Sequence, residues 1–218
     1  MKEVNGWAFP DIDEFMAGEM KADGTYQASH LRLALKHVTD LGVAVDGGAH
    51  VGTWSRLMAR AFGQVIALEP SADTHECLVE NMRRFGCPNV EVRQVALGAV
   101  AGLSAMVLDG PQLERKNTGG RYVAPASAKG DRTVRVETLD SWSLPSLGFL
   151  KLDVEGSEPL ALMGARATLA RCRPIVLFES KGLCRRYGLK PAAAQDVLAS
   201  CGYRELEIAG CDRVWGPR

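Results

Sequence analysis

The chain has 218 residues, of which 46% are hydrophobic and 24% charged, and its 26 basic residues balance its 26 acidic ones. This length and apolar content suffice for one sizeable α/β core and do not call for a second domain. With a formal net charge of zero, no global electrostatic field favours binding to nucleic acid or to an acidic membrane.

The cysteines and the N-terminal residues indicate a cellular compartment. The six cysteines show no Cys-x-x-Cys spacing, and we expect them to be reduced thiols. Residues 1–15 carry acids where a signal peptide needs an apolar core, and no apolar stretch is long enough to span a bilayer. We therefore expect a cytoplasmic protein that does not bind membranes.

The first 40 residues are expected to form a cover segment and a helix beside a main domain of residues 41–218. Residues 1–23 show no regular pattern and are expected to be irregular. Their aromatic side chains would anchor the segment on a neighbouring surface, and these are Trp7, Phe9 and Phe15.

Apolar residues at helical spacing predict a helix over residues 26–39. His30 and His37 lie seven positions apart, which places them on one face of this helix. No metal-binding cluster completes them. We therefore interpret both as ordinary surface or hydrogen-bonded histidines.

Residues 43–52, VAVDGGAHVG, combine a short apolar run with an acid and three glycines. An apolar run that ends at glycine predicts a buried parallel strand entering a tight turn, followed by a helix over residues 53–61. Glycines let a ligand approach the backbone closely, and the next helix presents unpaired N–H groups. The pattern indicates a ligand-binding loop.

The glycine spacing narrows the class of ligand. A dinucleotide fingerprint requires Gly-x-Gly-x-x-Gly, whereas here Asp46, Gly48 and Gly52 give Asp-x-Gly-x-x-x-Gly. A second apolar run, residues 64–70, predicts a strand that ends at Glu69. A carboxylate there suits a ribose with two free hydroxyls, such as that of S-adenosylmethionine (SAM). Each feature alone also fits a plain turn or a solvated strand end, so the two together carry the argument.

A helix is expected over residues 71–85, capped by Ser71 or Asp73. His75 lies in its first turns and faces either the adenosine or solvent. The side chains expected to point inward are Leu78, Val79 and Met82.

Alternation over residues 89–97 predicts a third strand whose end lies beside the cofactor base. Gln94 and Ala96 are therefore candidates for the adenine site. Short strands are expected on both sides of residues 109–131, at positions 103–108 and 133–136. The segment between them is rich in Gly, Pro and Ser, and it is either a substrate-capping lid or a solvated surface loop.

The second dense region is residues 149–158, FLKLDVEGSE. Strand alternation places Lys151, Asp153 and Glu155 on one face, although a central parallel strand is normally apolar on both faces. The charges therefore indicate a strand whose carboxyl end opens into a polar cleft. A structural pair between the lysine and a carboxylate is the alternative. The elements expected after it are a helix to about residue 170, a strand over 173–179, a helix over 191–200 and a hairpin-like pair over 203–208 and 213–215.

Several of these segments together resemble the FkbM-type SAM-dependent methyltransferases. They are DGGAHVG at 46–52, LEP at 68–70, TLD at 138–140, KLDVEGSE at 151–158 and PIVLFE at 174–179. The resemblance covers about residues 43–206, and the KxDxEGxE run is its most specific part. It implies a single-domain, α/β, Rossmann-like class I methyltransferase fold with a seven-stranded, mostly parallel sheet and one antiparallel strand. It also implies SAM as the donor and O-methylation of a hydroxyl on a sugar, glycan or small metabolite.

The resemblance places Asp46, Gly48 and Gly52 in the SAM loop, Glu69 on the ribose, and Asp153 with Glu155 beside the transferred methyl. The cofactor-binding candidates, including the two adenine-site candidates above, are Asp46, Gly48, Ala49, His50, Gly52, Glu69, Pro70, Gln94, Ala96 and Asp153. The family pattern often has Asn where this chain has His50. The catalytic candidates are Lys151, Asp153, Glu155 and Glu179.

A sulfonium methyl is already activated, so catalysis requires an aligned acceptor and a base for the hydroxyl proton. Asp153 and Glu155 are the first candidates for the base and are not ranked; Glu179 and His50 stand behind them. Asp153 contacting the SAM amino group is the alternative, and Lys151 would orient a carboxylate or stabilise an alkoxide. A magnesium site is possible, but no acid-rich cluster demands one, so we expect no metal.

Other functions fit the sequence less well. A nucleic-acid methyltransferase would share the SAM half, but the chain has no Pro-Pro amine-methylation motif, no basic excess and no appended binding domain. A non-catalytic SAM-binding module is a further alternative, because fold alone does not imply activity. The glycine spacing argues against a nicotinamide oxidoreductase. We expect a small-molecule or glycan acceptor as the partner, and the sequence does not indicate an oligomeric state.

Overall fold

A seven-stranded sheet forms the centre of the protein in the computed structural model, which describes residues 1–20, 26–108, 110–125 and 132–218. In spatial order its strands are β12 (Tyr203–Ala209), β13 (Asp212–Pro217), β11 (Ile175–Glu179), β10 (Phe149–Leu152), β3 (Val43–Gly47), β4 (Gln64–Leu68) and β5 (Val90–Arg93). β13 runs opposite to the other six strands, so its pairs with β11 and β12 are antiparallel and the remaining pairs of this sheet are parallel. The predicted mostly parallel sheet with one antiparallel strand near its edge is confirmed.

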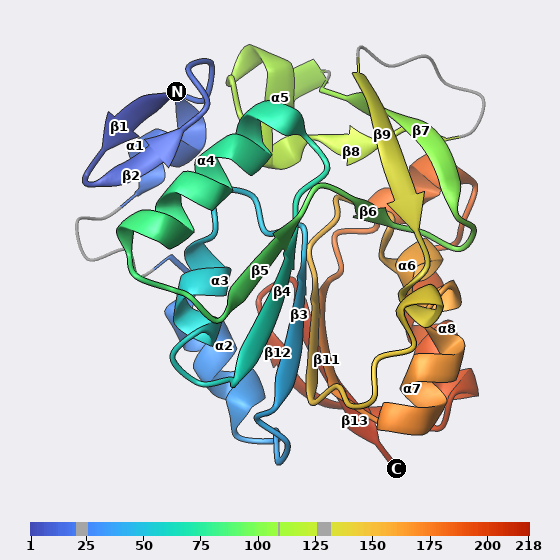
Figure 1. Ribbon diagram of the computed structural model, residues 1–218. Helices are drawn as coiled ribbons and strands as arrows, with labels where there is room; N and C mark the ends of the chain where they lie inside the picture. The colour runs from blue at the N-terminus through green and yellow to red at the C-terminus, as the bar shows by residue number, and fades with distance from the viewer. Residues whose placement is uncertain (21–25, 109, 126–131) are drawn as a thin grey trace.

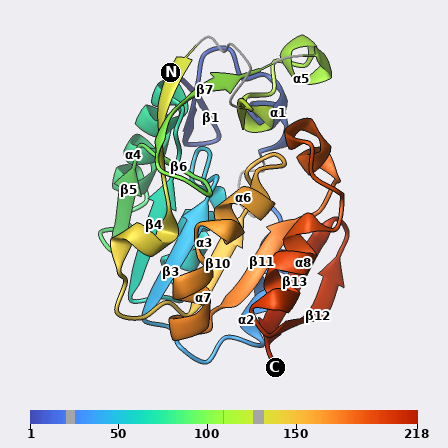
Figure 2. The same cartoon turned by 90° about the vertical axis from the view of Figure 1, so that its right-hand side faces the viewer.

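Helices cover both faces of this sheet (Figure 1). On one face lie α2 (Ala28–Leu35), α3 (Thr53–Met58) and α4 (Ala72–Arg84). On the other face, turned toward the viewer in Figure 2, lie α6 (Glu158–Met163), α7 (Arg166–Cys172) and α8 (Ala193–Ser200). Two short 3-10 helices, η2 (Leu139–Trp142) and η3 (Leu183–Tyr187), complete the connections.

The central strands are apolar on both faces because each face meets a helix layer. Val45 and Leu150 pack in the core beneath α6, α7 and α8. Their chain neighbours Ala44 and Phe149 pack in the opposite core, against Trp54 of α3. Charged side chains on these strands are therefore enclosed unless they lie at a strand end.

Residues 1–20 are regular, which corrects the expectation of an irregular segment over residues 1–23. β1 (Lys2–Val4) and β2 (Trp7–Phe9) form an antiparallel hairpin, and α1 (Phe15–Glu19) follows. The hairpin turn is Asn5-Gly6, with positive φ at both residues, and Asn-Gly is the preferred pair for such a turn. Residues 21–25 lie outside the described part of the chain.

The N-terminal hairpin is fastened to α4. The buried side-chain amide of Asn81 accepts a hydrogen bond from the N–H of Ala8 at 2.7 Å and donates one to its carbonyl at 2.9 Å. The ring of Trp7 lies 4.4 Å from that of Phe85 between centroids. Two of the predicted aromatic anchors are buried, but Phe15 is 37% exposed, so its prediction as an anchor is wrong.

A second, four-stranded sheet begins after β5 along the chain. Its strands, in spatial order, are β6 (Ala96–Leu97), β9 (Arg132–Glu137), β7 (Gly102–Val107) and β8 (Tyr122–Val123). The single strand predicted over residues 89–97 is therefore wrong, because the chain leaves the main sheet after Arg93 and pairs with β9 from Ala96.

The segment predicted as a loop over residues 109–131 contains regular structure between β7 and β9. Its elements are α5 (Gly110–Glu114), η1 (Thr118–Gly120) and β8. Residues 109 and 126–131 lie outside the described part of the chain. We refer to residues 110–125 as the lid segment.

Two predicted helices also differ in detail. Val79 is 45% exposed, because the buried face of α4 consists of Thr74, Cys77, Leu78, Asn81 and Met82. The helix predicted from Glu158 to about residue 170 is divided between α6 and α7 at Gly164. A side chain at that glycine would place its Cβ 2.1 Å from the carbonyl oxygen of Gly98, so the backbone passes too close for any other residue.

Candidate functional site

Two cavities meet at the carboxyl ends of the central strands. The Glu69 cavity has a volume of about 540 Å³ and the Glu179 cavity about 1010 Å³, each measured with its open mouth. Both are lined by Gly48, His50, Gly119 and Asp153. These shared residues place the loop after β3 and the loop after β10 at the junction of the two cavities.

The glycine loop after β3 is held tightly between its neighbours. Gly48 has φ +76°, and a Cβ there would lie 1.9 Å from the carbonyl oxygen of Asp153. The N–H groups of Gly48 and Ala49 both donate to the carbonyl of Leu68, at 3.1 and 2.9 Å. Gly52, with φ +95°, lines neither cavity. Its missing side chain makes room for α4 instead.

Glu69 is buried at the end of β4 and faces the cavity named after it. One carboxylate oxygen accepts a hydrogen bond from the N–H of Ser71 at 2.9 Å, and the other accepts from the N–H of His50 at 3.1 Å. Burial raises the pKa of the carboxyl group, in spite of the opposing effects of His50 and these hydrogen bonds. The carboxylate is thus fixed in direction and retains lone pairs for a ligand.

The other predicted cofactor residues divide into two groups. Pro70 and Ala96 line the Glu69 cavity, and Ala49 lines the Glu179 cavity. Gln94 lies outside both cavities, where its amide contacts the carbonyl of Pro70 at 3.5 Å. Asp46 is also absent from both walls, because it is buried beneath the glycine loop.

Asp46 and Lys151 form a buried ion pair below the junction of the cavities. The Nζ of Lys151 lies 3.0 Å from Asp46 Oδ1, 2.9 Å from the carbonyl of Gly48 and 3.9 Å from Asp153 Oδ2. The hydroxyl of Ser55 donates to Asp46 Oδ2 at 2.6 Å. Burial alone would lower the pKa of Lys151, but Asp46 and then Asp153 raise it, so the ammonium stays charged. This contact is a structural pair between the lysine and a carboxylate, which was the alternative considered for Lys151 from the sequence.

Asp153 and Glu155 lie beyond the end of β10, in the loop that follows it. The expectation that they share a strand face with Lys151 is therefore wrong, because the strand ends at Leu152. Glu155 has φ +52°, a conformation that side chains rarely adopt. The buried carboxylate of Glu158 holds this loop by accepting hydrogen bonds from the N–H groups of Val154 and Gly156, both at 3.1 Å.

Three carboxylates gather in the Glu179 cavity. One oxygen from each of Asp153, Glu155 and Glu179 lies within 4.8 Å of the others. Burial, and then the charge of Asp153, raises the pKa of Glu155 to about 7 and that of Glu179 to about 8. Lys181 donates to Glu179 at 2.6 Å and opposes this shift. The sequence did not indicate such a cluster, because Glu179 lies on a different strand.

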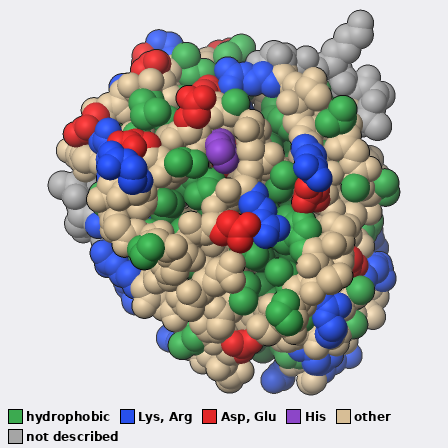
Figure 3. Space-filling view, viewed as in Figure 1, with side chains coloured by type: hydrophobic (Ala, Val, Ile, Leu, Met, Phe, Trp, Pro, Cys, Tyr) green, Lys and Arg blue, Asp and Glu red, His purple; other side chains and the backbone are tan. Residues whose placement is uncertain are grey.

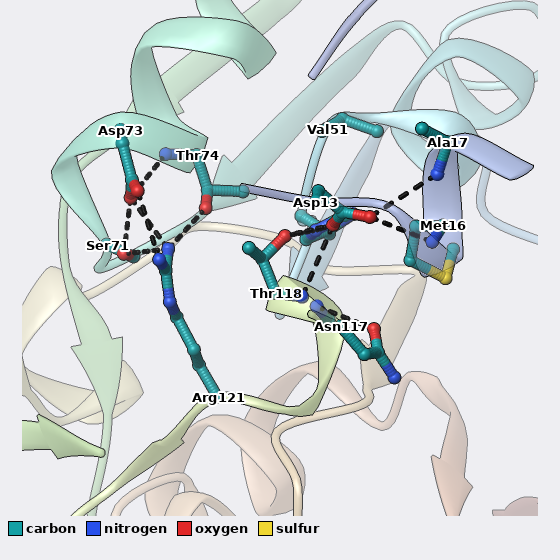
Figure 4. Close-up of polar contacts among 12 residues, drawn as sticks. Asp13, Met16, Ala17, Val51, Ser71, Asp73, Thr74, Asn117, Thr118 and Arg121 are labelled. Carbon is teal, nitrogen blue, oxygen red and sulfur yellow. Dashed lines mark hydrogen bonds and ion pairs between the residues drawn. The ribbon is translucent and has the colours of Figure 1, made fainter. Parts of the chain in front are cut away.

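The lid segment forms the roof of the Glu69 cavity, and the N-terminal cover holds the lid segment from outside. Thr118 donates through both its hydroxyl and its N–H to the buried carboxylate of Asp13, which also accepts from the N–H of Met16 at 2.8 Å (Figure 4). Nε2 of His50 lies 2.8 Å from the Thr118 hydroxyl oxygen. The glycine loop, the cover and the lid segment thus meet in one polar network.

Arg121 ties the other side of the lid segment to the start of α4 (Figure 4). Its guanidinium donates to both carboxylate oxygens of Asp73, at 2.7 and 3.0 Å, and to the hydroxyls of Ser71 and Thr74. Burial alone would raise the pKa of Asp73, but these contacts, with Arg132, hold it well below its usual range. Ser71 is the residue at the N-cap of α4, but its hydroxyl donates to Asp73. It therefore makes no capping hydrogen bond to a backbone N–H of the first turn.

Comparison with known protein families identifies the family of this chain. The profile of the methyltransferase FkbM domain family matches residues 46–205, which is well over half of the chain. The chain belongs to the FkbM methyltransferase family. SAM, the predicted cofactor, is the methyl donor of this family.

Solved structures confirm the Rossmann-like class I methyltransferase fold. Methyltransferase FkbM from Methylobacillus flagellatus is 16% identical, with a TM-score of 0.54 over 81% of this chain and 43% of that one. Magnesium protoporphyrin IX methyltransferase from Synechocystis, solved with bound SAM, is 14% identical, with a TM-score of 0.51 over 94% and 85% of the two chains. Precorrin 8w decarboxylase from Methanobacterium thermoautotrophicum is also 14% identical, with a TM-score of 0.50 over 88% and 90%.

These likenesses show the fold alone, because the identities are low. The FkbM-family chain spans less than half the length of the Methylobacillus protein. Among curated proteins, none matches the sequence significantly. None of the helices in the described ranges is both long and apolar enough to cross a bilayer.

Sequence reasoning missed part of the Glu179 cavity of this FkbM-family protein. His30 lines the cavity, and its Nδ1 lies 2.7 Å from Oδ2 of the buried Asp212. The contact with Asp212 agrees with the hydrogen-bonded alternative for His30, but its place in the cavity was not expected. His37 fits the interpretation as a surface histidine better, since it lies outside this cavity and contacts Glu207 at 3.4 Å. The partner acid of His30 lies 182 positions away, so no local pattern could indicate the pair.

Proposed function

We propose that this protein transfers the methyl group of SAM to a hydroxyl of a sugar, a glycan or a small metabolite. The observation that carries the proposal is the junction of the two cavities at Asp153. The Glu69 cavity has the features of a nucleoside site, and the Glu179 cavity holds proton-accepting groups. Methyl transfer requires donor and acceptor to meet in line at one place, and the shared wall supports such an arrangement.

The residues of the Glu69 cavity fit the adenosine part of SAM. The fixed carboxylate of Glu69 can accept hydrogen bonds from both ribose hydroxyls. Ala96 and Leu97 offer apolar contact for the adenine. Gly48 has no side chain to block the methionine part from reaching Asp153. In this proposal Asp46 and Gly52 act from below, by holding the loop in place.

The Glu179 cavity fits the acceptor. SAM supplies an electrophilic methyl group, so the chain must orient a hydroxyl and remove its proton. The raised pKa values of Glu155 and Glu179 allow these groups to exchange protons with their surroundings near neutral pH. Asp153, which both cavities share, is placed to contact the donor, and Lys151 orients it from below.

The N-terminal cover and the lid segment select the acceptor in this proposal. Phe15 and Met16 of the cover and Asn117 and Gly119 of the lid segment line the Glu179 cavity. Residues 1–40 would then act as a cover on a catalytic domain of residues 41–218. Acceptor choice would vary with these segments, since they lie outside the strands that build the fold.

A small-molecule or glycan acceptor in the cytoplasm agrees with the charge distribution on the surface and with the free thiols. Basic and acidic side chains are interspersed over the face shown in Figure 3, which favours this acceptor class over a nucleic acid. All six cysteines are free, as expected in a reducing compartment.

The proposal is tested first by calorimetric titration with SAM, S-adenosylhomocysteine and NADH. We expect micromolar binding of both sulfur ligands and none of NADH. In Glu69→Ala, SAM affinity should fall by about 1 to 3 kcal/mol, or roughly 5- to 150-fold, because a charged hydrogen-bonding partner is lost. The control is Glu91→Ala, which removes a strand acid outside both cavities.

The second step measures transfer of radiolabelled methyl from SAM to a panel of hydroxylated glycans and metabolites. Label in an alkali-stable ether product supports O-methylation. SAM binding without transfer to any member would favour a non-catalytic SAM-binding module. Absence of SAM binding would overturn the proposal entirely.

A further inference from the structure

The His30–Asp212 pair suggests a role that depends on the proposed function. We propose that His30 is the base that removes the proton from the acceptor hydroxyl, and that Asp212 is its positioning residue. His30 lies on α2 and Asp212 begins β13, so two distant parts of the chain bring the pair to the Glu179 cavity.

The geometry of the pair favours a base at the second ring nitrogen. Asp212 is only 7% exposed, and its Oδ2 lies 2.7 Å from Nδ1 of His30. A carboxylate at this position holds the proton on Nδ1 and leaves the lone pair on Nε2. The imidazole is 28% exposed at the cavity, and none of the described residues hydrogen-bonds its Nε2.

The other histidine of this cavity is less suited to the role. Nε2 of His50 contacts the hydroxyl of Thr118, and that hydroxyl has a single proton, which it donates to Asp13. Nε2 of His50 must therefore donate to Thr118, so it has no lone pair for an acceptor. Among the carboxylates, Glu179 is already paired with Lys181 at 2.6 Å.

The cavity around His30 holds groups of both charges. Besides Asp212, the charged and titratable groups that share the cavity include Tyr26, Lys151, Asp153, Glu155, Glu179 and Lys181. Lys151 is matched by Asp46 beneath the loop, and Lys181 by Glu179. The carboxylate of Asp212 lies directly beside an imidazolium formed during the reaction.

The step balances in atoms and charge. The acceptor oxygen forms a bond to the methyl carbon as the carbon–sulfur bond breaks, and the electron pair of that bond neutralises the sulfonium. The hydroxyl proton moves to Nε2 of His30, which becomes an imidazolium held by Asp212. It then passes to solvent, and the carboxylates of Asp153 and Glu155 remain free to orient the donor and the acceptor.

The first arm of the test needs no acceptor. Long-range ¹⁵N–¹H NMR at pH 8, on the protein bound to S-adenosylhomocysteine, reports which ring nitrogen of His30 carries the proton. We expect the Nδ1–H form in the wild type and its loss in Asp212→Asn. An Nε2–H form in the wild type would overturn the proposal, whether or not an acceptor is known.

The second arm measures methyl transfer from labelled SAM to a panel of methyl glycosides. We expect His30→Gln to lower the rate about 10²- to 10⁴-fold, the usual contribution of a general base, with SAM affinity within twofold of the wild type. Added imidazole should restore activity at least tenfold to His30→Ala. The matched control is His37→Gln, a histidine with an acidic partner outside the cavity, which should keep the wild-type rate.

The two proposals fail in different ways. A wild type that binds SAM but methylates no glycoside counts against O-methylation of this acceptor class, and the NMR result still decides the state of His30. A wild type that is active, with His30→Gln within threefold of its rate, overturns the base assignment and leaves the proposed function intact.

Discussion

Lys151 and Asp46 are direct register partners on the neighbouring parallel strands β10 and β3, and their side chains form an ion pair with Nζ 3.0 Å from Oδ1. Both lie in the interior, where apolar packing is usually at least as stabilising as an ion pair. The pair also holds the carbonyl of Gly48 at 2.9 Å. The ion pair therefore serves to hold the glycine loop after β3 against β10, the strand that leads into the loop of Asp153 and Glu155.

Removing one partner of this pair should destabilise the protein strongly. We expect Lys151→Met to lower the free energy of unfolding by about 3 to 5 kcal/mol, because Asp46 is left buried and uncompensated. Urea denaturation measures the change. The double variant Asp46→Asn/Lys151→Met should recover more than half of the loss, and a double variant no more stable than the single one would contradict this account.

The contact between Arg121 and Asp73 should control how long SAM stays bound. We expect Arg121→Ala to speed SAM dissociation about tenfold, because the loss of a bidentate, charge-assisted contact releases one side of the lid segment. Arg121→Lys should recover little of it, since an ammonium cannot reproduce the two-pronged geometry. Stopped-flow measurement of SAM release tests both variants. Arg115→Ala, an exposed arginine of the same segment, serves as control and should match the wild type.

A side chain at Gly48 should damage the site more than one at another glycine. Gly48→Ala places a Cβ 1.9 Å from a backbone oxygen and forces a positive φ on alanine. We expect at least a hundredfold loss of SAM affinity and a lower melting temperature, measured by calorimetry and thermal unfolding. Gly102→Ala, where a Cβ meets nothing within 4 Å, should leave SAM affinity unchanged. Equal effects of the two substitutions would refute the close approach.

The acidic cluster should make stability fall as pH rises. The pKa of Glu155 is raised from 4.5 to about 7, so between these values the folded state holds a proton that the unfolded state has lost. Stability then declines with pH across this window. Glu155→Gln should therefore be more stable than the wild type at pH 8 by roughly 1 to 2 kcal/mol, allowing for partial exposure, and should lose this advantage near pH 5. Urea titrations at both pH values measure the difference, with the exposed Glu114→Gln as control.

The central sheet and the glycine loop after β3 were predictable because local patterns determine them. Apolar runs bounded by glycine specified β3 and β4, and the spacing of Asp46, Gly48 and Gly52 argues against a nicotinamide site. The N-terminal hairpin was also within reach of local reasoning, since Asn5-Gly6 is a strong turn signal. It was missed because each of its strands is only three residues long.

The polar contacts that close the cavities could not be predicted, because they join distant parts of the chain. Asp13 and Thr118 are 105 positions apart, and His30 and Asp212 are 182. Gln94 was assigned to the adenine site on the assumption of one continuous strand, and the chain instead leaves the main sheet there. The sequence allowed Lys151 either a place in a polar cleft or a structural pair with a carboxylate. The strand register shows that its buried partner is Asp46.

The roof over the Glu69 cavity has a kinetic consequence. Thr118 and Arg121 line that cavity while they bond to Asp13 and Asp73, so the bound donor would sit beneath contacts that must separate before it can be exchanged. Each reaction cycle would then include one opening and one closing of this roof. When acceptor is abundant, we expect the rate to be limited by the exchange of S-adenosylhomocysteine for SAM and not by the transfer of the methyl group.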